Sequence, residues 1–451
     1  EKTAEKAISP QRNPKTQGGA HGTTIRFHHH RIHQAGGPAE AGQPGLQRRR
    51  GQMSHPGRSG VRKRPGLPDA GKEAASRGPG GLCRPGAHSA MRVCSICLDG
   101  FRNYTNFSAS FDPGVNVIWG ENAQGKTNIL ESIYLSATTK SHRGNKDREL
   151  IKFEENEAHI RIHFEKQGID HQLDMHLKKN KAKGVAIDKI PIRRSSDLLG
   201  QIPVILFSPE DLKIVKSGPS ERRKFLDIEL SQMERLYLYQ LTNYNKILIQ
   251  RNNLLKQIRF QNNLIDTLEA WDIQLVKYGS EVIKYREKFI KHLGKVCQKI
   301  HNKLTGGKEQ ILLEYDRNVG YDSYLTELKK KRQKDLKYFT TTVGPHRDDI
   351  SFVVNGIDIR KYGSQGQQRT AALSLKLAQI QLMREVMKES PILLLDDVLS
   401  ELDSNRKTYL LESIKDTQTI ITCTGLDEFI SKHLPIQRMF QIKAGKIVKE
   451  N

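Results

Sequence analysis

This chain of 451 residues has little cysteine and no long apolar run. Its cysteines are too few and too scattered for a disulfide framework, which favours a reducing compartment; they are Cys83, Cys94, Cys97, Cys297 and Cys423. The Cys94-x-x-Cys97 pair has no second pair to complete a zinc site, and it lies in an expected strand, where residues three apart face opposite sides. No apolar stretch reaches the roughly 20 residues of a membrane span. We therefore expect a soluble, cytoplasmic protein with no membrane partner.

Acidic residues are also scarce, 50 against 74 basic ones, which gives a formal net charge of +24. A basic surplus of this size favours a polyanionic partner such as nucleic acid. Lysine-rich, solvated helix faces would produce the same surplus, so charge alone does not decide between the two interpretations.

Residues 1–90 lack any periodic apolar pattern and hold sixteen of the 36 glycines and nine of the 17 prolines. Such a segment cannot bury enough surface to offset its chain entropy, so a disordered basic extension is expected. It could be a nucleic-acid-binding arm, or a metal-binding tract at His28-His29-His30. We favour a third reading, in which Met91 is the true start and the extension is a mis-assigned leader.

The most informative stretch of the chain runs from Val115 to Thr127. An apolar strand leads into a glycine-rich loop with the spacing G-x-x-x-x-G-K-T, and a helix with apolar residues at three- and four-residue spacing follows. This is the setting of a phosphate-binding loop for ATP, in which lysine reaches the outer phosphates and threonine ligates Mg²⁺. The expected nucleotide-binding residues are Gly120, Glu121, Asn122, Ala123, Gln124, Gly125, Lys126 and Thr127.

Two further sequence patterns follow this loop. Short alternating runs at residues 158–164, 171–177 and 185–192 indicate an antiparallel layer beside the nucleotide site. From about Ser220 to Lys303, apolar residues recur at helical period without an intervening proline, which predicts two or three long helices packed together. The expected stripe consists of Leu226, Leu230, Met233, Leu236, Leu241, Tyr244, Leu248 and Leu255.

A second anion site is expected where a long helix opens near Tyr362 and runs to about Glu389. Ser364 and Gln367 have the spacing of a capping box, which defines the helix start. The helix end exposes N–H groups, Gly366 keeps the backbone accessible, and the dipole favours an anion. A capped helix near no ligand would have the same sequence.

The apolar run Ile392–Leu395 predicts a buried strand that ends in Asp396 and Asp397. In nucleotide-hydrolysing domains an acid at such a strand end lies in the Mg²⁺ shell, which we assign to Asp396 together with Thr127. A second acid beside it can orient or deprotonate the attacking water. Asp397 and Lys126 are therefore the candidate catalytic residues.

The order of these features resembles the ABC-type ATPase heads of the SMC family and, more narrowly, the family of bacterial RecF recombination mediators. The resemblance covers residues 91–451. It includes stretches that general ABC heads lack, namely Phe101-Arg-Asn-Tyr104, Gly120-Glu-Asn-Ala-Gln-Gly-Lys-Thr-Asn128, Phe207-Ser-Pro-Glu-Asp-Leu212, Arg222-Arg-Lys-Phe-Leu-Asp227, Trp271-Asp-x-Gln-Leu275 and Gly344-Pro-His-Arg-Asp-Asp349.

The resemblance implies an α/β fold: an ABC-type ATPase head, with a mixed sheet and an antiparallel layer, and an inserted α-helical arm. The head would consist of residues 91–218 and 336–451, and the arm of residues 219–335. It also implies an ATP-dependent homodimer, in which Ser364 and Gly366 of one subunit meet the γ-phosphate held by Lys126 of the other.

The family implies slow ATP hydrolysis by a switch that binds double-stranded DNA beside single-stranded gaps. With RecO and RecR it would help to load RecA during replication, repair and the SOS response. This chain departs from most ABC heads in carrying Asp397 where they have glutamate. It also lacks a switch histidine in Ile420–Gly425, and no Q-loop glutamine is evident, the nearest candidate being Phe207–Asp211.

Two other functions stay open. Overcoming-lysogenisation-type nucleases begin with a similar phosphate loop but carry a further acidic metal-binding domain. A structural DNA clamp with a vestigial ATPase is the other alternative.

Overall fold

The computed structural model describes residues 91–144, 146–425 and 435–451, which all lie in one compact unit, Ser76–Asn451. The expectations for residues 1–90, including the His28-His29-His30 tract, fall outside the described residues. Within the described ranges, no helix combines the length and the apolar character needed to cross a membrane.

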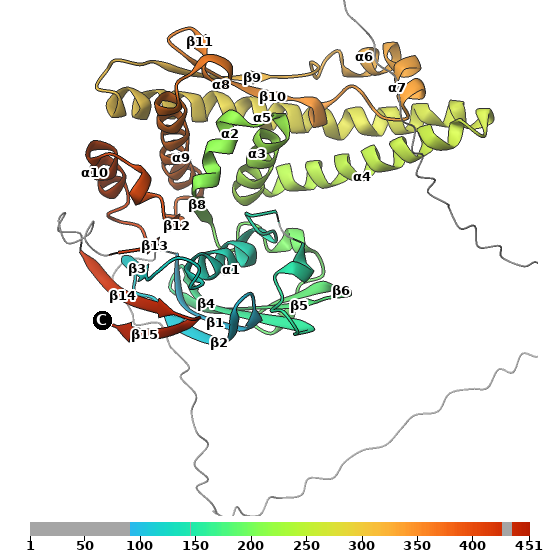
Figure 1. Ribbon diagram of the computed structural model, residues 1–451. Coiled ribbons are helices and arrows are strands. Elements are labelled where there is room, and N and C mark those ends of the chain that lie inside the picture. The colour runs from blue at the N-terminus through green and yellow to red at the C-terminus, as the bar shows by residue number, and fades with distance from the viewer. Residues whose placement is uncertain (1–90, 145, 426–434) are drawn as a thin grey trace, which may run out of the picture. The chain divides into compact units, whose positions relative to one another are not determined.

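A mixed sheet of six strands forms the centre of this unit, in the order β15–β14–β3–β13–β12–β8 (Figure 1). Neighbouring strands are parallel except for the antiparallel β14–β15 pair. The carboxyl ends of β3 and β12 therefore meet at one edge, where doubly wound sheets bind their ligands. The strands are β3 (Val115–Trp119), β8 (Val204–Phe207), β12 (Ile392–Asp396), β13 (Thr419–Cys423), β14 (Ile436–Lys443) and β15 (Lys446–Glu450).

Alternate residues of the central strands face two separate cores. In β12, Leu393 and Leu395 belong to the cluster formed with the long helices, whereas Ile392 and Leu394 belong to the cluster on the other face. Successive residues of a strand point to opposite sides, so one apolar run of this kind serves two layers.

The cluster on the other face, which contains Ile392 and Leu394, also includes residues of helix α1 (Lys126–Thr138) and of an antiparallel sheet. The strand order of this sheet is β2–β1–β4–β5–β6–β7. This confirms the mixed sheet with an antiparallel layer. The expected strand over 185–192 is wrong in its bounds: Asp188 and Lys189 adopt positive φ and turn the chain between β6 and β7. The strands are β1 (Arg92–Phe101), β2 (Tyr104–Ser110), β4 (Glu157–Lys166), β5 (Ile169–Lys178), β6 (Lys181–Ile187) and β7 (Ile190–Pro191).

Both cysteines of the Cys94-x-x-Cys97 pair lie in β1, and the register of β1 with β4 shifts between Val93 and Ser95, at Cys94. Cys94 is buried, whereas Cys97 is exposed and carries a free thiol. Cys297 and Cys423 are buried, and Cys297 is a free thiol.

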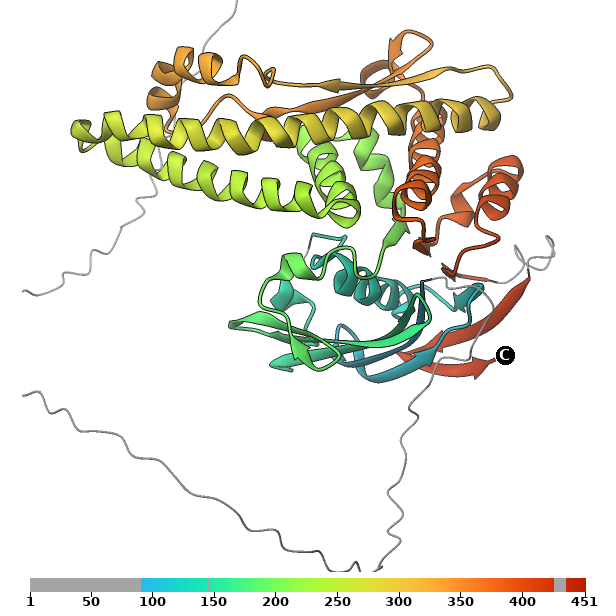
Figure 2. The same ribbon diagram turned by 180° about the vertical axis from the view of Figure 1, so that it is seen from behind.

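The cluster that contains Leu393 and Leu395 consists largely of residues from four helices. They are α3 (Pro219–Met233), α4 (Arg235–Ile258), α5 (Leu268–Leu304) and α9 (Gln365–Met387). Figures 1 and 2 show α4 and α5 side by side as an antiparallel pair. The expected stripe is interrupted at Glu234, whose extended backbone separates α3 from α4. Leu236 is consequently on the outside, 60 % exposed, and does not belong to the stripe.

A three-stranded sheet in the order β11–β10–β9 packs along α5. Strands β9 (Ile311–Asp316) and β10 (Asp349–Val354) pair across residue 335, and the division into arm and head at that residue remains a prediction. The other elements are β11 (Ile357–Asp358), α2 (Leu212–Lys216), α6 (Tyr324–Lys330), α7 (Arg332–Tyr338), α8 (Ile359–Tyr362), α10 (Ser404–Ser413) and the 3₁₀ turns Asp147–Glu149, Ser195–Asp197, Pro209–Asp211, Asn262–Thr267, Pro345–Arg347 and Leu399–Glu401.

Buried arginines fasten the helices to one another. Arg251 of α4 donates to Asp272 of α5 and to Asp335 of α7, both at 2.7 Å, and all three side chains are fully buried. Removing one partner of such a pair leaves an uncompensated buried charge, which costs about 3–5 kcal/mol. The network therefore fixes which helices pack together.

Two glycines on α5 provide a test of this packing. A Cβ on Gly279 would lie 2.6 Å from a ring carbon of Tyr324 and 2.9 Å from one of Tyr244, whereas a Cβ on Gly294 would meet Leu313 at an ordinary 3.5 Å. We expect Gly279→Ala to lower the free energy of unfolding by about 1–3 kcal/mol through overpacking. Gly294→Ala should raise it by up to about 1 kcal/mol through helix propensity. Urea unfolding measures both, and equal effects at the two positions would contradict this account.

Candidate functional site

The loop from Gly120 to Gly125 joins β3 to α1 at the carboxyl edge of the central sheet (Figure 1). Gly120 and Gly125 have φ of 148° and 108°, and a Cβ on Gly120 would lie 2.4 Å from the carbonyl oxygen of Ile442. No side chain caps α1, so its first N–H groups are directed at the loop. The expected strand, loop and helix are confirmed, and the helix end is suited to an anion.

Lys126 is bent back over this loop. Its ammonium donates to the carbonyl oxygens of Gly120 at 2.6 Å and Glu121 at 2.7 Å, and the residue is only 7 % exposed. Burial lowers the pKa of the ammonium, and the nearby Asp397 and Asp396 carboxylates oppose that shift. A buried cation held by neutral carbonyls is chemically suited to the outer phosphates of a nucleotide.

Thr127 and Asp396 come together from opposite ends of the sequence. The Thr127 hydroxyl donates to Asp396 Oδ1 at 2.7 Å, and the Thr422 hydroxyl donates to the same oxygen at 2.8 Å. Hydroxyl and carboxylate oxygens are the ligands that Mg²⁺ prefers. The residues present therefore fit the predicted metal site.

Asp397 has a left-handed backbone, with φ of 53°, directly after the buried strand β12. Its N–H lies 3.2 Å from the carbonyl oxygen and 3.1 Å from the hydroxyl of Thr422, to which it donates. Its negative charge acts on Lys126, which places it beside the phosphate loop. Thr422, where a switch histidine was sought, thus holds both acids in place.

Sequence reasoning assigned no role to Asn103 and Tyr104, although both lie in a stretch that carried the family resemblance. Asn103 donates to the carbonyl oxygen of Gln124 at 3.1 Å, and Tyr104 donates to that of Gly125 at 3.0 Å. From the other side, the Ala444 N–H donates to Gln124 Oε1 at 2.6 Å. The only signal in the sequence was the motif itself, because these contacts join segments far apart in the chain.

The start of α9 is formed as expected. Ser364 accepts from the N–H of Gln367 at 3.2 Å, and the Gln367 side chain accepts from the N–H of Ser364 at 3.0 Å, which completes the capping box. Asp349 holds the preceding helix α8 by accepting from Arg360 at 3.0 Å and from Arg222 at 2.5 Å.

Ser364, Gly366 and Gln367 are not brought to the phosphate loop of their own chain. In Figure 1, α9 begins beside α8, at the end of the helix away from the central sheet, whereas the phosphate loop follows β3 in that sheet. The structure therefore gathers residues 120–127, 396 and 397 into one site and leaves the serine-headed helix start outside it.

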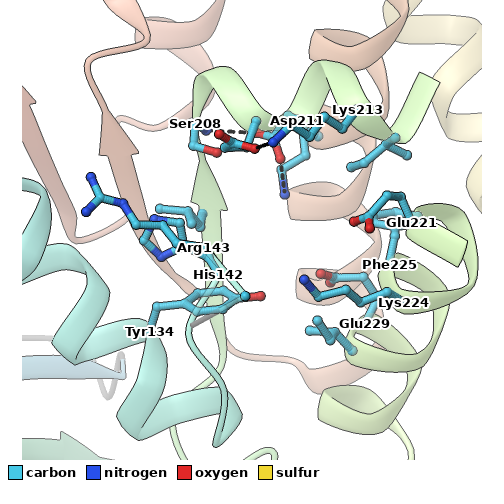
Figure 3. Close-up of a pocket in the computed structure, with 16 residues that line it drawn as sticks. Tyr134, His142, Arg143, Ser208, Asp211, Lys213, Glu221, Lys224, Phe225 and Glu229 are labelled. Atoms are coloured by element: carbon cyan, nitrogen blue, oxygen red, sulfur yellow. Dashed lines mark hydrogen bonds and ion pairs between the residues drawn. The ribbon is translucent and has the colours of Figure 1, made fainter. Parts of the chain in front are cut away.

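A cavity of about 230 Å³ lies behind α1, between the central sheet and α3. Figure 3 shows three residues around it: Tyr134 of α1, Asp211 of the turn Pro209–Asp211, and Glu229 of α3. Asp211 ends the segment nearest to a Q-loop and lies 3.7 Å from Lys376 of α9. This contact joins the turn after β8 to helix α9.

Glu229 is buried at the wall of this cavity, and its Oε2 atom has no hydrogen-bond partner among the described residues. Burial raises the pKa of Glu229 to about 7, although the nearby Lys376 opposes the shift. Near neutral pH this carboxyl therefore changes between its protonated and ionised forms.

Comparisons with known proteins give one consistent likeness. The RecF/RecN/SMC N terminal domain family matches residues 92–447. The chain is 56 % identical over 359 residues to the DNA replication and repair protein RecF of Lachnoclostridium phytofermentans, which covers 80 % of this chain and 100 % of that protein. It is 46 % identical over 365 residues to the protein of the same name from Clostridium acetobutylicum, covering 80 % and 100 %.

A solved structure of the recombination mediator protein RecF with ATP, in the RecFOR pathway, matches with a TM-score of 0.76. Its sequence identity to this chain is 37 %, and the match covers 81 % of this chain and 99 % of that one.

The buried carboxyl gives a prediction about pH. In the unfolded chain Glu229 titrates near 4.5, so the proton that the folded state keeps up to about pH 7 stabilises it at low pH. That contribution is lost progressively as the pH rises from about 4.5 to about 7, at a cost of up to about 3 kcal/mol. We expect Glu229→Gln to gain about 1–3 kcal/mol of unfolding free energy relative to the unmodified chain between pH 5 and pH 8.

Urea unfolding at pH 5, 6, 7 and 8 measures this gain. Glu221→Gln, which changes another carboxyl of α3 that lines the same cavity, is the matched control. A difference between the Glu229→Gln variant and the unmodified chain that stays constant with pH would contradict the assignment.

Proposed function

The chain belongs to the RecF/RecN/SMC N terminal domain family, and we propose that it is an ATP-dependent recombination mediator of the RecF type in DNA replication and repair. The observation that carries the proposal is the joined site of Lys126, Thr127 and Asp396 in a chain 56 % identical to a RecF protein. The match to a RecF structure with ATP, which covers 99 % of that chain, supports ATP as the ligand.

In this proposal ATP lies along the loop of residues 120–125, with its outer phosphates on Lys126 and on the uncapped start of α1. Release of the ammonium from the carbonyls of Gly120 and Glu121 would let it contact the phosphates instead. Asn103, Tyr104 and Ala444 hold the loop in shape by hydrogen bonds to its backbone and to Gln124.

Mg²⁺ would be held by Thr127 and Asp396, with Thr422 orienting the carboxylate. Such an ion neutralises charge on the phosphates while the nucleotide reacts. Asp397 lies next along the chain, and its carboxylate would orient or deprotonate the attacking water. It is one methylene shorter than glutamate, which suits slow hydrolysis and a timing switch.

We infer that the active assembly is an ATP-dependent homodimer. The start of α9 lies away from the phosphate loop of its own chain, so Ser364, Gly366 and Gln367 can reach a γ-phosphate only on a second copy. The helix start would then add N–H groups and its dipole to the anion held by Lys126.

The polyanion that this basic chain binds would be double-stranded DNA beside a single-stranded gap, contacted mainly at phosphates and therefore in a salt-sensitive way. Relatives placed in the RecFOR pathway support RecO and RecR as partners, with RecA loading as the result. A protein with this role would work in the bacterial cytoplasm, where the chromosome lies.

Two substitutions separate ATP binding from hydrolysis. Lys126→Met should weaken ATP binding about 100-fold or more, because a charged hydrogen-bond donor to the phosphates is lost. Asp397→Asn should leave binding nearly unchanged and slow turnover by about 10²–10⁴-fold. Asparagine tolerates the left-handed backbone at this position, so the variant should fold.

Fluorescent-nucleotide binding and phosphate release measure the two effects. Glu401→Gln removes a charge from the exposed turn that follows and serves as the control. Hydrolysis at the normal rate by the Asp397→Asn variant would show that Asp397 is not the base.

Dimerisation is tested at the helix start. Ser364→Arg should block the ATP-dependent dimer and the ATP-stimulated binding of gapped duplex DNA while nucleotide binding persists. Ser364→Asp keeps an N-cap residue but opposes the triphosphate with its charge, so it should act in the same way without loosening the helix. Gln381→Arg adds the same positive charge as Ser364→Arg, but at an exposed position further along α9, and should have no effect.

Sedimentation velocity with and without ATP, together with gapped-DNA binding, reads out both steps. A monomer–dimer equilibrium that ATP does not shift, in the unmodified chain, would rule out the shared site.

A further inference from the structure

The exposed face of the antiparallel sheet carries two histidines directly opposite each other. His159 of β4 pairs with His176 of β5 in the strand register, and Glu157 lies two residues before His159 on the same face. Opposite residues of antiparallel strands have Cβ atoms about 4.5–5.5 Å apart. The backbone itself therefore sets the separation of these three side chains.

The side chains converge on one point. The two imidazole rings are stacked, with centroids 3.9 Å apart and planes 23° from parallel. His176 Nε2 lies 3.0 Å from one carboxylate oxygen of Glu157, and His159 Nε2 lies 3.9 Å from the other. One ligand atom of each residue lies within 4.8 Å of those of the other two.

We propose that Glu157, His159 and His176 form a Zn²⁺ site, unrelated to the nucleotide site, that cross-links β4 to β5. Zinc binds imidazole nitrogen and carboxylate oxygen at about 2.0–2.2 Å, which places tetrahedral ligand atoms about 3.3 Å apart. The two rings must turn out of their stacked arrangement for both imidazoles to face one ion, and the three side chains are 33–49 % exposed, which leaves them room to turn. A donor set of two imidazole nitrogens and one carboxylate oxygen favours Zn²⁺, because Mg²⁺ and Ca²⁺ prefer oxygen ligands alone.

The surroundings leave room for a fourth ligand. Asp99 of β1 is paired with His159 on its other side and is exposed on the same face, next to a groove of about 640 Å³. Water can complete the coordination from there.

One cation competes for the carboxylate. The Lys178 ammonium lies 3.1 Å from a carboxylate oxygen of Glu157. The Lys178 side chain is 41 % exposed and can turn into solvent when zinc binds.

Such a site exists only when β4 and β5 are paired, so zinc would bind the folded chain and stabilise it by mass action. The test is isothermal titration of the nucleotide-free full chain with Zn²⁺, together with thermal unfolding with and without the metal. His159→Asn and His176→Asn should each lower the affinity of one zinc at least tenfold and abolish the zinc-dependent rise of the unfolding midpoint.

Two controls isolate the site. His163→Asn changes a histidine further along β4 on the same face, and it should keep both effects. A triple change of His28, His29 and His30 to serine removes the histidine run of residues 1–90, and the zinc assigned to the sheet should remain.

Glu157→Gln, which keeps the shape of the side chain, provides a second route to the same loss. Equal midpoints without metal establish that the variants are folded. Unchanged zinc binding in the His159, His176 and Glu157 variants, or binding that disappears only with the triple change, would overturn the proposal.

Discussion

The hydrogen bond between Thr127 and Asp396 is the contact on which the rest of the site depends. It joins residues 269 positions apart and fixes the phosphate-loop helix against the acidic end of β12. The residues next to each partner belong to the same site: Lys126 lies over the loop, and Asp397 has a left-handed backbone directly after Asp396. Without the parallel register of β3, β13 and β12, these side chains would not share one edge.

The residues proposed to complete the site of a second chain lie at the start of α9, and partly buried polar contacts hold this helix start. Asp349 accepts from Arg222 of α3 and from Arg360 of α8, which immediately precedes the capped start of α9. Lys376, near the middle of α9, lies by Asp211 at the wall of the cavity behind α1. Helix α9 is thus held at its start through α3 and α8, and near its middle by the turn that follows β8. A shift of either layer would move Ser364.

Local pattern was enough to predict much of this arrangement. The glycine spacing gave the phosphate loop, the apolar run gave β12, and the Ser364 to Gln367 spacing gave the capping box. The sequence could not place Asn103, Tyr104 or Thr422, because their contacts depend on which strands pair. It also gave no sign that Glu234 would separate two helices and leave Leu236 exposed, since apolar periodicity continues across that residue. The cross-strand histidines likewise became visible only once the register of β4 and β5 was known.

The most direct test of the shared site is a cross-link between two differently substituted chains. One carries Asn122→Cys in the phosphate loop and the other carries Ser364→Cys at the start of α9, both with Cys97→Ser, because Cys97 is exposed. With a short bifunctional maleimide, we predict a covalent mixed dimer that forms only when ATP is present and is absent when either cysteine is missing. A cross-link that is unaffected by ATP, or no cross-link with ATP bound, would contradict the account that two chains share each triphosphate.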